Sequence, residues 1–178
     1  FDALMWAAQH GRTENIKEWL DYFGGTWPLE RTEKVAGHTL LQIAAMNASD
    51  GAEEIVQGLL EAMANPQHIC ELGNSSLNPV GASVNSVPSL VRRLATAAAD
   101  VNMQTVPRTL KWRTLLAVAR LAAKNGTKKQ MLLEMATWGG RSPLMAAAVN
   151  GKVAEVQELL ALRADPSLLN HQGPTALD

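Results

Sequence analysis

The residues most able to do chemistry are one histidine and the single cysteine, His68 and Cys70, which stand two positions apart. An imidazole can activate a neighbouring thiol as a nucleophile when a third group orients the imidazole. The turn-rich segment that carries them offers no orienting acid. A buried, unreactive thiol is therefore the favoured interpretation of Cys70.

No other pattern points to catalysis. The four histidines, His10, His38, His68 and His171, have no Cys, Asp or Glu partner at metal-site spacing. The chain also lacks a nucleophile elbow, a phosphate-binding glycine loop and a dinucleotide fingerprint. We expect no catalytic residue, no cofactor and no metal. One cysteine gives no disulfide framework and favours a reducing, intracellular compartment.

Charge divides the chain into two unlike halves. Residues 1–89 hold four Lys/Arg against eleven Asp/Glu, whereas residues 90–178 hold twelve against six. Basic residues around Trp112 would suit nucleic acid or an anionic membrane surface, but an acidic protein is the more common partner of such a surface. No apolar run reaches the roughly 20 residues of a membrane span.

The elements that position these residues follow from six leucines: Leu4, Leu41, Leu77, Leu116, Leu144 and Leu177. Their spacing is 28 to 39 residues, and most have an alcohol or Asp two positions before and small residues after. Self-similarity at this period predicts a stacked array of helix pairs. All of these leucines except Leu77 are expected to be buried at equivalent places, each at the start of an inner helix.

The clearest unit runs from Gly140 to Pro166. Ser142 can cap a helix, Pro143 suits its first position, and Gly151 can end it in a left-handed turn. A second amphipathic helix follows, and the unit ends with Ala-Asp-Pro. This unit resembles the ankyrin repeat, which implies an all-α solenoid with short hairpin connections and a role in protein–protein interaction.

The resemblance extends, with varying quality, over the chain as a single array. The expected repeats are residues 1–33, 34–70, 71–106, 107–138 and 139–170, with the start of another at 171–178. The fourth lacks the usual closing sequence and lies only 28 residues before the fifth. In the third, Pro79 and Gly81 replace the usual alanines and should weaken the inner helix, so residues 67–89 are either a long loop or a decayed helix. Because neither end supplies a cap, we also expect the sequence to be an excerpt of a longer chain.

The resemblance implies that hairpin tips and the concave inner-helix face bind a partner protein. Carried onto this chain, these positions are Gln9, His10, His38, Met46, Asn47, Asn74, Lys111, Arg113, Trp138, Arg141, Val149 and Asn150. Two other roles stay open: a structural subunit held in a large multiprotein assembly, and the targeting domain of a longer enzyme.

Repeats four and five should bring Lys111, Arg113, Trp138 and Arg141 to neighbouring hairpin tips. Three cations around an indole suit an acidic protein segment. Trp112 and Trp138 precede the fourth and fifth repeat openings, near the hairpin tips, and the alternative for each is a lid that only covers its own hairpin.

Overall fold

The computed structural model describes residues 2–23, 25–47, 51–83 and 87–177, without the side chains of residues 47 and 82. Over these residues the protein is all-α, with ten helices and no strand beyond an isolated bridge between Thr32 and Thr39. The helices are α1 (Ala3–Gln9), α2 (Thr13–Phe23), α3 (Leu40–Asn47), α4 (Ala52–Glu61), α5 (Leu77–Ala82), α6 (Pro88–Thr96), α7 (Leu110–Lys124), α8 (Gln130–Ala136), α9 (Pro143–Val149) and α10 (Val153–Ala161).

Four helix pairs form a continuous solenoid. The inner helices stack in the order α1, α3, α5, α9, and the outer helices stack beside them in the order α2, α4, α6, α10. As predicted, side-chain oxygens cap two inner helices: Asp2 accepts from the Met5 N–H at 2.9 Å and Ser142 from the Met145 N–H at 3.3 Å.

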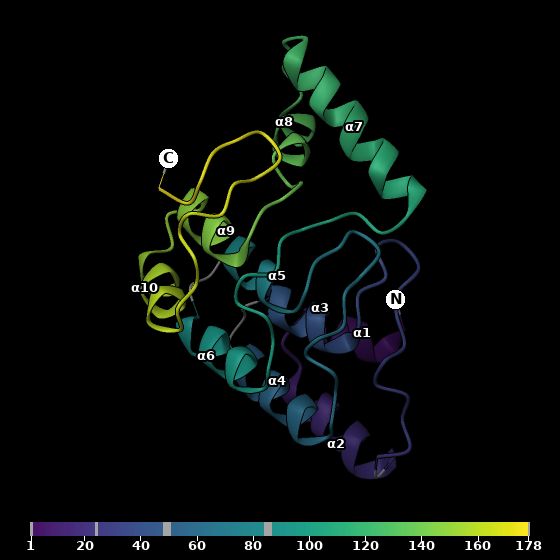
Figure 1. Ribbon diagram of the computed structural model, residues 1–178. Coiled ribbons are helices and arrows are strands. Elements are labelled where there is room, and N and C mark those ends of the chain that lie inside the picture. The colour runs from purple at the N-terminus through teal and green to yellow at the C-terminus, as the bar shows by residue number, and fades with distance from the viewer. Residues whose placement is uncertain (1, 24, 48–50, 84–86, 178) are drawn as a thin grey trace.

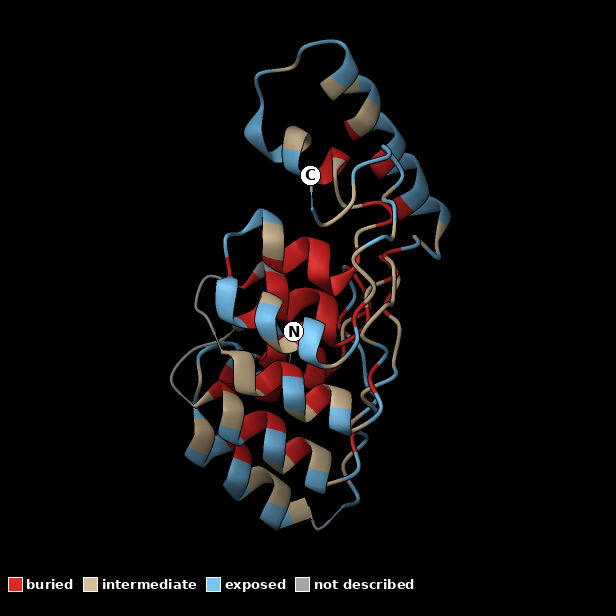
Figure 2. Ribbon diagram, turned by 60° about the vertical axis from the view of Figure 1, so that its left-hand side comes forward, coloured by how far each residue is buried: buried red, intermediate tan, exposed pale blue. Residues whose placement is uncertain are grey.

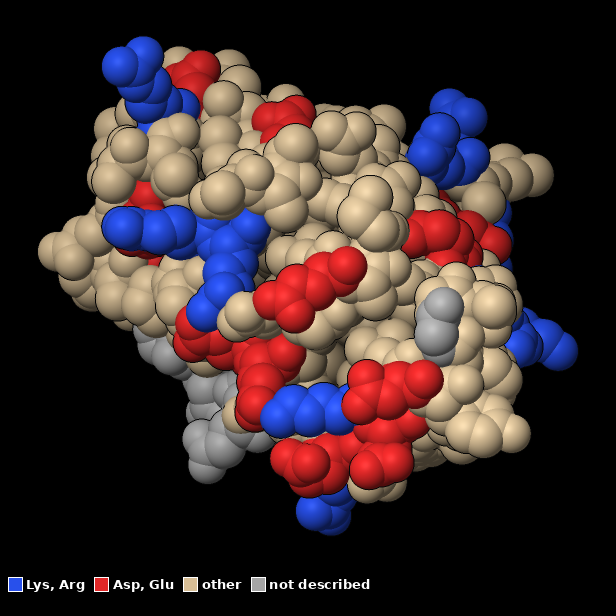
Figure 3. All heavy atoms as spheres, turned by 90° about the horizontal axis from the view of Figure 1, so that it is seen from below, with Lys and Arg blue, Asp and Glu red and all other residues tan. Residues whose placement is uncertain are grey.

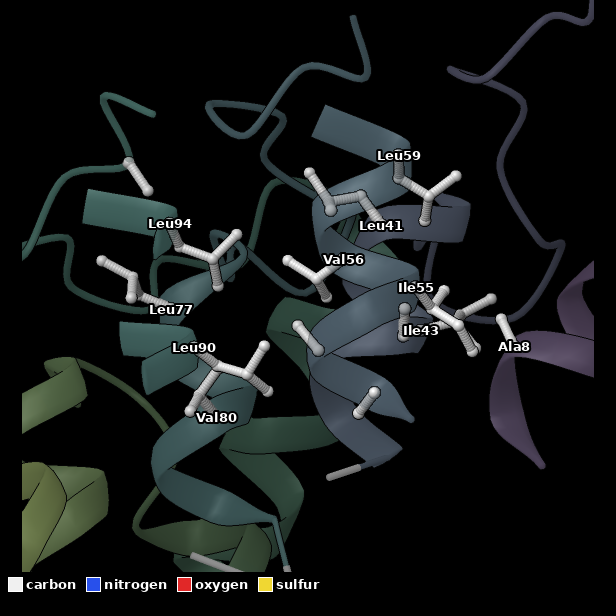
Figure 4. Close-up of a cluster of buried hydrophobic side chains, with 14 of the residues drawn as sticks. Ala8, Leu41, Ile43, Ile55, Val56, Leu59, Leu77, Val80, Leu90 and Leu94 are labelled. Atoms are coloured by element: carbon white, nitrogen blue, oxygen red, sulfur yellow. The ribbon is translucent and has the colours of Figure 1, made fainter. Parts of the chain in front are cut away.

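The core lies between the inner and outer layers. Leu41, Leu77, Leu90 and Leu94 lie there (Figure 4), and the inner helices carry more buried residues than the outer helices (Figure 2). Four of the five leucines predicted to be buried, at positions 4, 41, 116 and 144, are at most 2 % exposed, and so is Leu77. Leu177 is the exception, with 83 % of its surface exposed, because it follows a turn and no helix forms around it.

The third inner helix forms despite its proline and glycine. Pro79 occupies the third position of α5, where a helical N–H has no partner within the helix to lose. Gly81 faces α9 so closely that a Cβ built on it would lie 2.9 Å from the Ala147 amide nitrogen. Residues 77–82 are therefore a short helix packed against α9, which agrees with a decayed helix at these positions and not with a long loop.

The main departure from the predicted array is the pair α7–α8. The fourth repeat was expected to lie between the third and the fifth, but α9 packs directly against α5, and α10 against α6. The α7–α8 pair packs mainly within itself and stands apart from the stack in Figure 1. Leu116 is buried, but it lies in the middle of α7 and not at the start of an inner helix.

Backbone hydrogen bonds show where the pair is inserted. In the hairpin before α5, the Cys70 N–H donates to the Asn74 carbonyl at 3.1 Å, and the Gly73 N–H donates to the Cys70 carbonyl at 2.9 Å. The hairpin before α9 has the same two bonds: Thr105 N–H to Arg141 carbonyl at 3.0 Å, and Gly140 N–H to Thr105 carbonyl at 2.8 Å. Only residues 71 and 72 close the first hairpin, whereas residues 106–139 close the second. The α7–α8 pair is thus an insertion at a hairpin tip.

Ion pairs connect the outer helices. Lys17 of α2 pairs with Glu54 of α4 at 2.5 Å, and Arg93 of α6 pairs with Glu53 at 2.8 Å. Arg92 of α6 makes a two-pronged contact with Glu158 of α10, at 2.6 and 2.9 Å. Figure 3, viewed from the side of α2 and α4, shows the two signs interleaved on this face. Exposed pairs of this kind add little stability because solvent screens them, so the core and not the surface charge stabilises the stack.

Candidate functional site

A cavity of about 280 Å³ lies where the inserted pair meets the stack. Its walls come from α3, α5 and α9, from the hairpins before α3, α5 and α9, and from two tryptophans of the insertion. The lining residues are Ala36, His38, Met46, Leu72, Asn74, Asn78, Pro79, Ser83, Thr105, Trp112, Trp138, Arg141 and Ala146. We call this cavity the roofed pocket.

Buried amide side chains hold the stack side of the roofed pocket in place. The Asn78 side chain accepts from the Ser75 N–H at 2.9 Å and donates to the Met103 and Arg141 carbonyls at 3.0 and 3.2 Å. Gln42 makes the equivalent contacts one repeat earlier, donating to the His68 and Asn74 carbonyls. Because each amide joins a helix start to a hairpin, this part of the pocket is preorganised.

The side of the pocket opposite the stack, which we call its roof, comes from α7 and the segment after α8. Trp112 is 9 % exposed and packs with Leu116, Ala36 and Leu72 in a second hydrophobic cluster, against which Trp138 is partly buried. Within the described residues, the buried indole N–H of Trp112 has no hydrogen-bond acceptor. The roof therefore adheres to the hairpins through apolar contact, supplemented by the Lys111 ammonium, which lies 3.4 Å from the Glu71 carboxylate.

His38 lies in the wall of the roofed pocket beside a buried carboxylate. Its Nδ1 is 3.3 Å from Glu33, which also accepts backbone N–H bonds from Val35 and Ala36 at 2.5 and 2.7 Å. Burial raises the pKa of Glu33, but these backbone bonds outweigh it and leave the pKa below its usual value. Burial lowers the pKa of His38, with Glu33 acting in the opposite direction. At neutral pH His38 is therefore a neutral hydrogen-bonding group and Glu33 is ionised.

Arg141 brings a positive charge to the same pocket. Its guanidinium donates to the Thr137 hydroxyl, and among the described residues no carboxylate lies within ion-pair distance of it. Burial lowers its pKa, and the more distant Glu134 raises it in part. A half-buried cation with no direct counter-ion favours the approach of an anionic group.

The structure brings together five of the twelve predicted binding residues. His38, Met46, Asn74, Trp138 and Arg141 line the roofed pocket.

The others lie elsewhere. Gln9 and His10 are exposed at the end of α1, where His10 stacks on Trp6 at 5.3 Å, and Val149 and Asn150 are exposed at the end of α9. Lys111 and Arg113 lie in the first turn of α7, away from the pocket lining, because α7 is part of an insertion and not of a stacked repeat. The side chain of Asn47 lies outside the described residues.

Sequence reasoning missed the contribution of Trp112 to the pocket and assigned it to a hairpin tip of a stacked repeat. The available signal was its position four residues before Leu116, where the second, third and fifth copies have Gly37, Gly73 and Gly140. Leu72 and Thr105 gave no signal, because their hairpins approach the pocket only after folding. Among the described residues, no cluster of His, Cys, Asp and Glu could hold a metal, and no helix is long and apolar enough to cross a membrane.

Comparison with known families gives one match. The ankyrin repeat model matches residues 139–171, which hold the pocket residues Arg141 and Ala146 and the helices α9 and α10. No curated protein matches the chain. The match identifies residues 139–171 as similar to one ankyrin repeat within the all-α solenoid, and it does not extend to the other helix pairs.

Proposed function

We propose that this chain is a non-catalytic protein-binding module that holds a segment of a partner protein in the roofed pocket. Ankyrin repeats are in general protein–protein interaction modules. The observation that carries the proposal is the pocket itself, in which an apolar cavity opens between inner helices and hairpins and collects five predicted binding residues. Pockets of this type, with few polar groups among apolar walls, are common binding sites.

The lining indicates the chemistry of the partner segment. Met46, Trp112 and Trp138 suit an aliphatic or aromatic side chain, and Arg141 suits a carboxylate beside it. We infer an acidic segment with one apolar anchor residue. Most of the contact energy would come from burying the anchor, whereas the charge would steer the encounter.

Selection of a displayed random peptide library on the folded protein tests this proposal. The selected peptides should share an apolar residue next to Asp or Glu. Trp138→Ala should weaken their binding by about 2 kcal/mol or more, because a partly buried indole at an interface is a typical hot spot. Met46→Trp should block the pocket with no loss of helical content.

Trp6→Ala is the matched control, since Trp6 is an exposed tryptophan on α1 outside the pocket. It should leave peptide binding unchanged. If Trp6→Ala abolishes binding and Trp138→Ala does not, the binding surface lies at the other end of the stack. If no peptide is enriched, the pocket is not a peptide site.

A further inference from the structure

Positive charge is concentrated in the inserted segment. Residues 106–139 hold seven Lys/Arg and one acidic residue, Glu134, for a net charge of +6, whereas the rest of the chain has a net charge of −7. In the stack, Lys17, Arg92 and Arg93 are paired with glutamates. Among the described residues of the insertion, six of the seven cations make no ion pair: Arg108, Arg113, Arg120, Lys124, Lys128 and Lys129.

The exposed side of α7 is also apolar. The buried stripe of this helix, Trp112, Leu116 and Ala119, packs against α8 and the hairpins. On the remaining surface Leu110, Val118 and Leu121 are 75 %, 58 % and 59 % exposed. Figure 2 shows exposed residues along α7.

Helical geometry arranges these residues in two parallel rows. Leu110, Val118 and Leu121 are eight and three residues apart, which places them on one stripe about 16 Å long. Arg113, Arg120 and Lys124 are seven and four residues apart and form a row along one flank of that stripe. The row and the stripe together make the surface that we call the outer face of α7.

We propose that the outer face of α7 docks an acidic amphipathic helix of a partner protein, at a site separate from the roofed pocket. A helix laid along the stripe would bury its own apolar row against Leu110, Val118 and Leu121, with carboxylates on one flank meeting the three cations. This is the arrangement by which helix pairs combine an apolar seam with flanking charges. The cations lie on one flank only and the exposed apolar residues are aliphatic, which suits a helix better than a membrane or stacked bases.

Binding of a synthetic peptide to the full chain tests this proposal directly. The probe is a fluorescein-labelled acidic amphipathic helix of about 16 residues, long enough to span the stripe, with leucines on one side and glutamates on both flanks. Two control peptides carry lysines in place of the glutamates, or the same residues in scrambled order. Fluorescence anisotropy with the full chain should show binding of the acidic helix alone, weakening as salt rises.

Two variants separate charge from apolar contact. Reversal of the cation row, Arg113→Glu with Arg120→Glu and Lys124→Glu, should weaken binding at least about tenfold. Val118→Ser with Leu121→Ser should do so to a similar extent, with the charge unchanged. The matched control, Arg12→Glu with Lys34→Glu and Arg163→Glu, changes the net charge equally on exposed sites of the stack and should leave the affinity unchanged. Circular dichroism confirms that each variant is folded.

Several outcomes would contradict docking of an acidic helix on the outer face of α7. The proposal is overturned if the acidic helix does not bind, or if the control reversal weakens binding as much as reversal of the row. It is also overturned if phosphatidylserine vesicles bind more tightly than the peptide, or if velocity sedimentation shows salt-sensitive self-association through α7. Trp138→Ala should leave this peptide bound, so failure of the pocket proposal and failure of this one are distinguishable.

Discussion

Replacement of Gly81 by alanine tests the central feature of the architecture, the direct contact between α5 and α9. A Cβ at this position would lie 2.9 Å from the Ala147 amide nitrogen and 3.0 Å from both the Ala146 Cβ and the Pro143 carbonyl oxygen. All three atoms belong to α9, and none is the mobile end of a long side chain. The two helices must therefore move apart by a few tenths of an ångström to admit one methyl group.

Two effects of opposite sign determine the result. Overpacking a rigid contact costs about 1–3 kcal/mol. Alanine in place of a glycine inside a helix stabilises the helix by at most about 1 kcal/mol. The gain is smaller here because Gly81 lies one residue before the end of α5. We expect the free energy of unfolding to fall by about 1–2 kcal/mol, measured by urea denaturation followed by circular dichroism.

Gly58→Ala provides the matched control. Gly58 lies inside α4, and its nearest neighbour to a new Cβ is the Leu20 side chain at 3.8 Å, an ordinary contact. This variant should gain up to about 1 kcal/mol from helix propensity alone. If Gly81→Ala stabilises the protein as Gly58→Ala does, α5 does not pack on α9, and α7–α8 would have to be placed between them as an ordinary repeat.

Three further outcomes follow from the same structure. Leu144→Ala should lower the free energy of unfolding by about 2–5 kcal/mol in the same urea assay, because this side chain is 2 % exposed in the core, and a loss below about 1 kcal/mol would contradict its burial. Replacement of residues 106–139 by the two-residue connection Glu-Leu, as at positions 71 and 72, should remove the circular dichroism signal of α7 and α8 and leave a stack that unfolds cooperatively. A non-cooperative unfolding transition would show that the insertion is part of the array. The free energy of unfolding should fall as the pH is lowered from 7 to 5. Burial lowers the pKa of His38 below its ordinary 6.5. The unfolded chain therefore binds more protons than the folded one as the pH falls through 6.5 towards the lowered value. His38→Asn should reduce that slope, and an unchanged slope would assign it to other groups.

The solenoid could be predicted from sequence because its determinants are local and recur. A capping oxygen, a leucine two residues later and small residues after it specify an inner helix in each copy, as Asp2 and Ser142 show. Gln42 and Asn78 occupy the same helix position and tie it to the hairpins, but neither contact could be inferred, because the accepting carbonyls lie 25 or more residues away.

The inserted pair was taken for a repeat because its length imitates one. Ser75 and Ser142 are 67 residues apart, about twice the 36 and 33 residues that separate Thr39 from Ser75 and Ser142 from Thr175. An amphipathic pattern shows which side of a helix is buried but not what covers it, and the buried stripe of α7 is covered by hairpin residues such as Leu72. The missing closing sequence before Gly139 and the indole of Trp112 were the two local signs of a different arrangement.

The two sides of the insertion have different roles because one faces the stack and the other faces solvent. The side facing the stack contributes Trp112 to the roofed pocket, while the outer face of α7 presents cations and aliphatic side chains to solvent. Because the insertion joins the stack at one hairpin, between Thr105 and Gly140, substitutions on its outer face should leave the core of the solenoid unchanged. Excision of residues 106–139 should therefore abolish binding at both sites while the stack stays folded, whereas Trp138→Ala and reversal of the α7 cations should each weaken binding at one site only. That pattern would show that partner recognition resides largely in the insertion and that the repeats serve as its support.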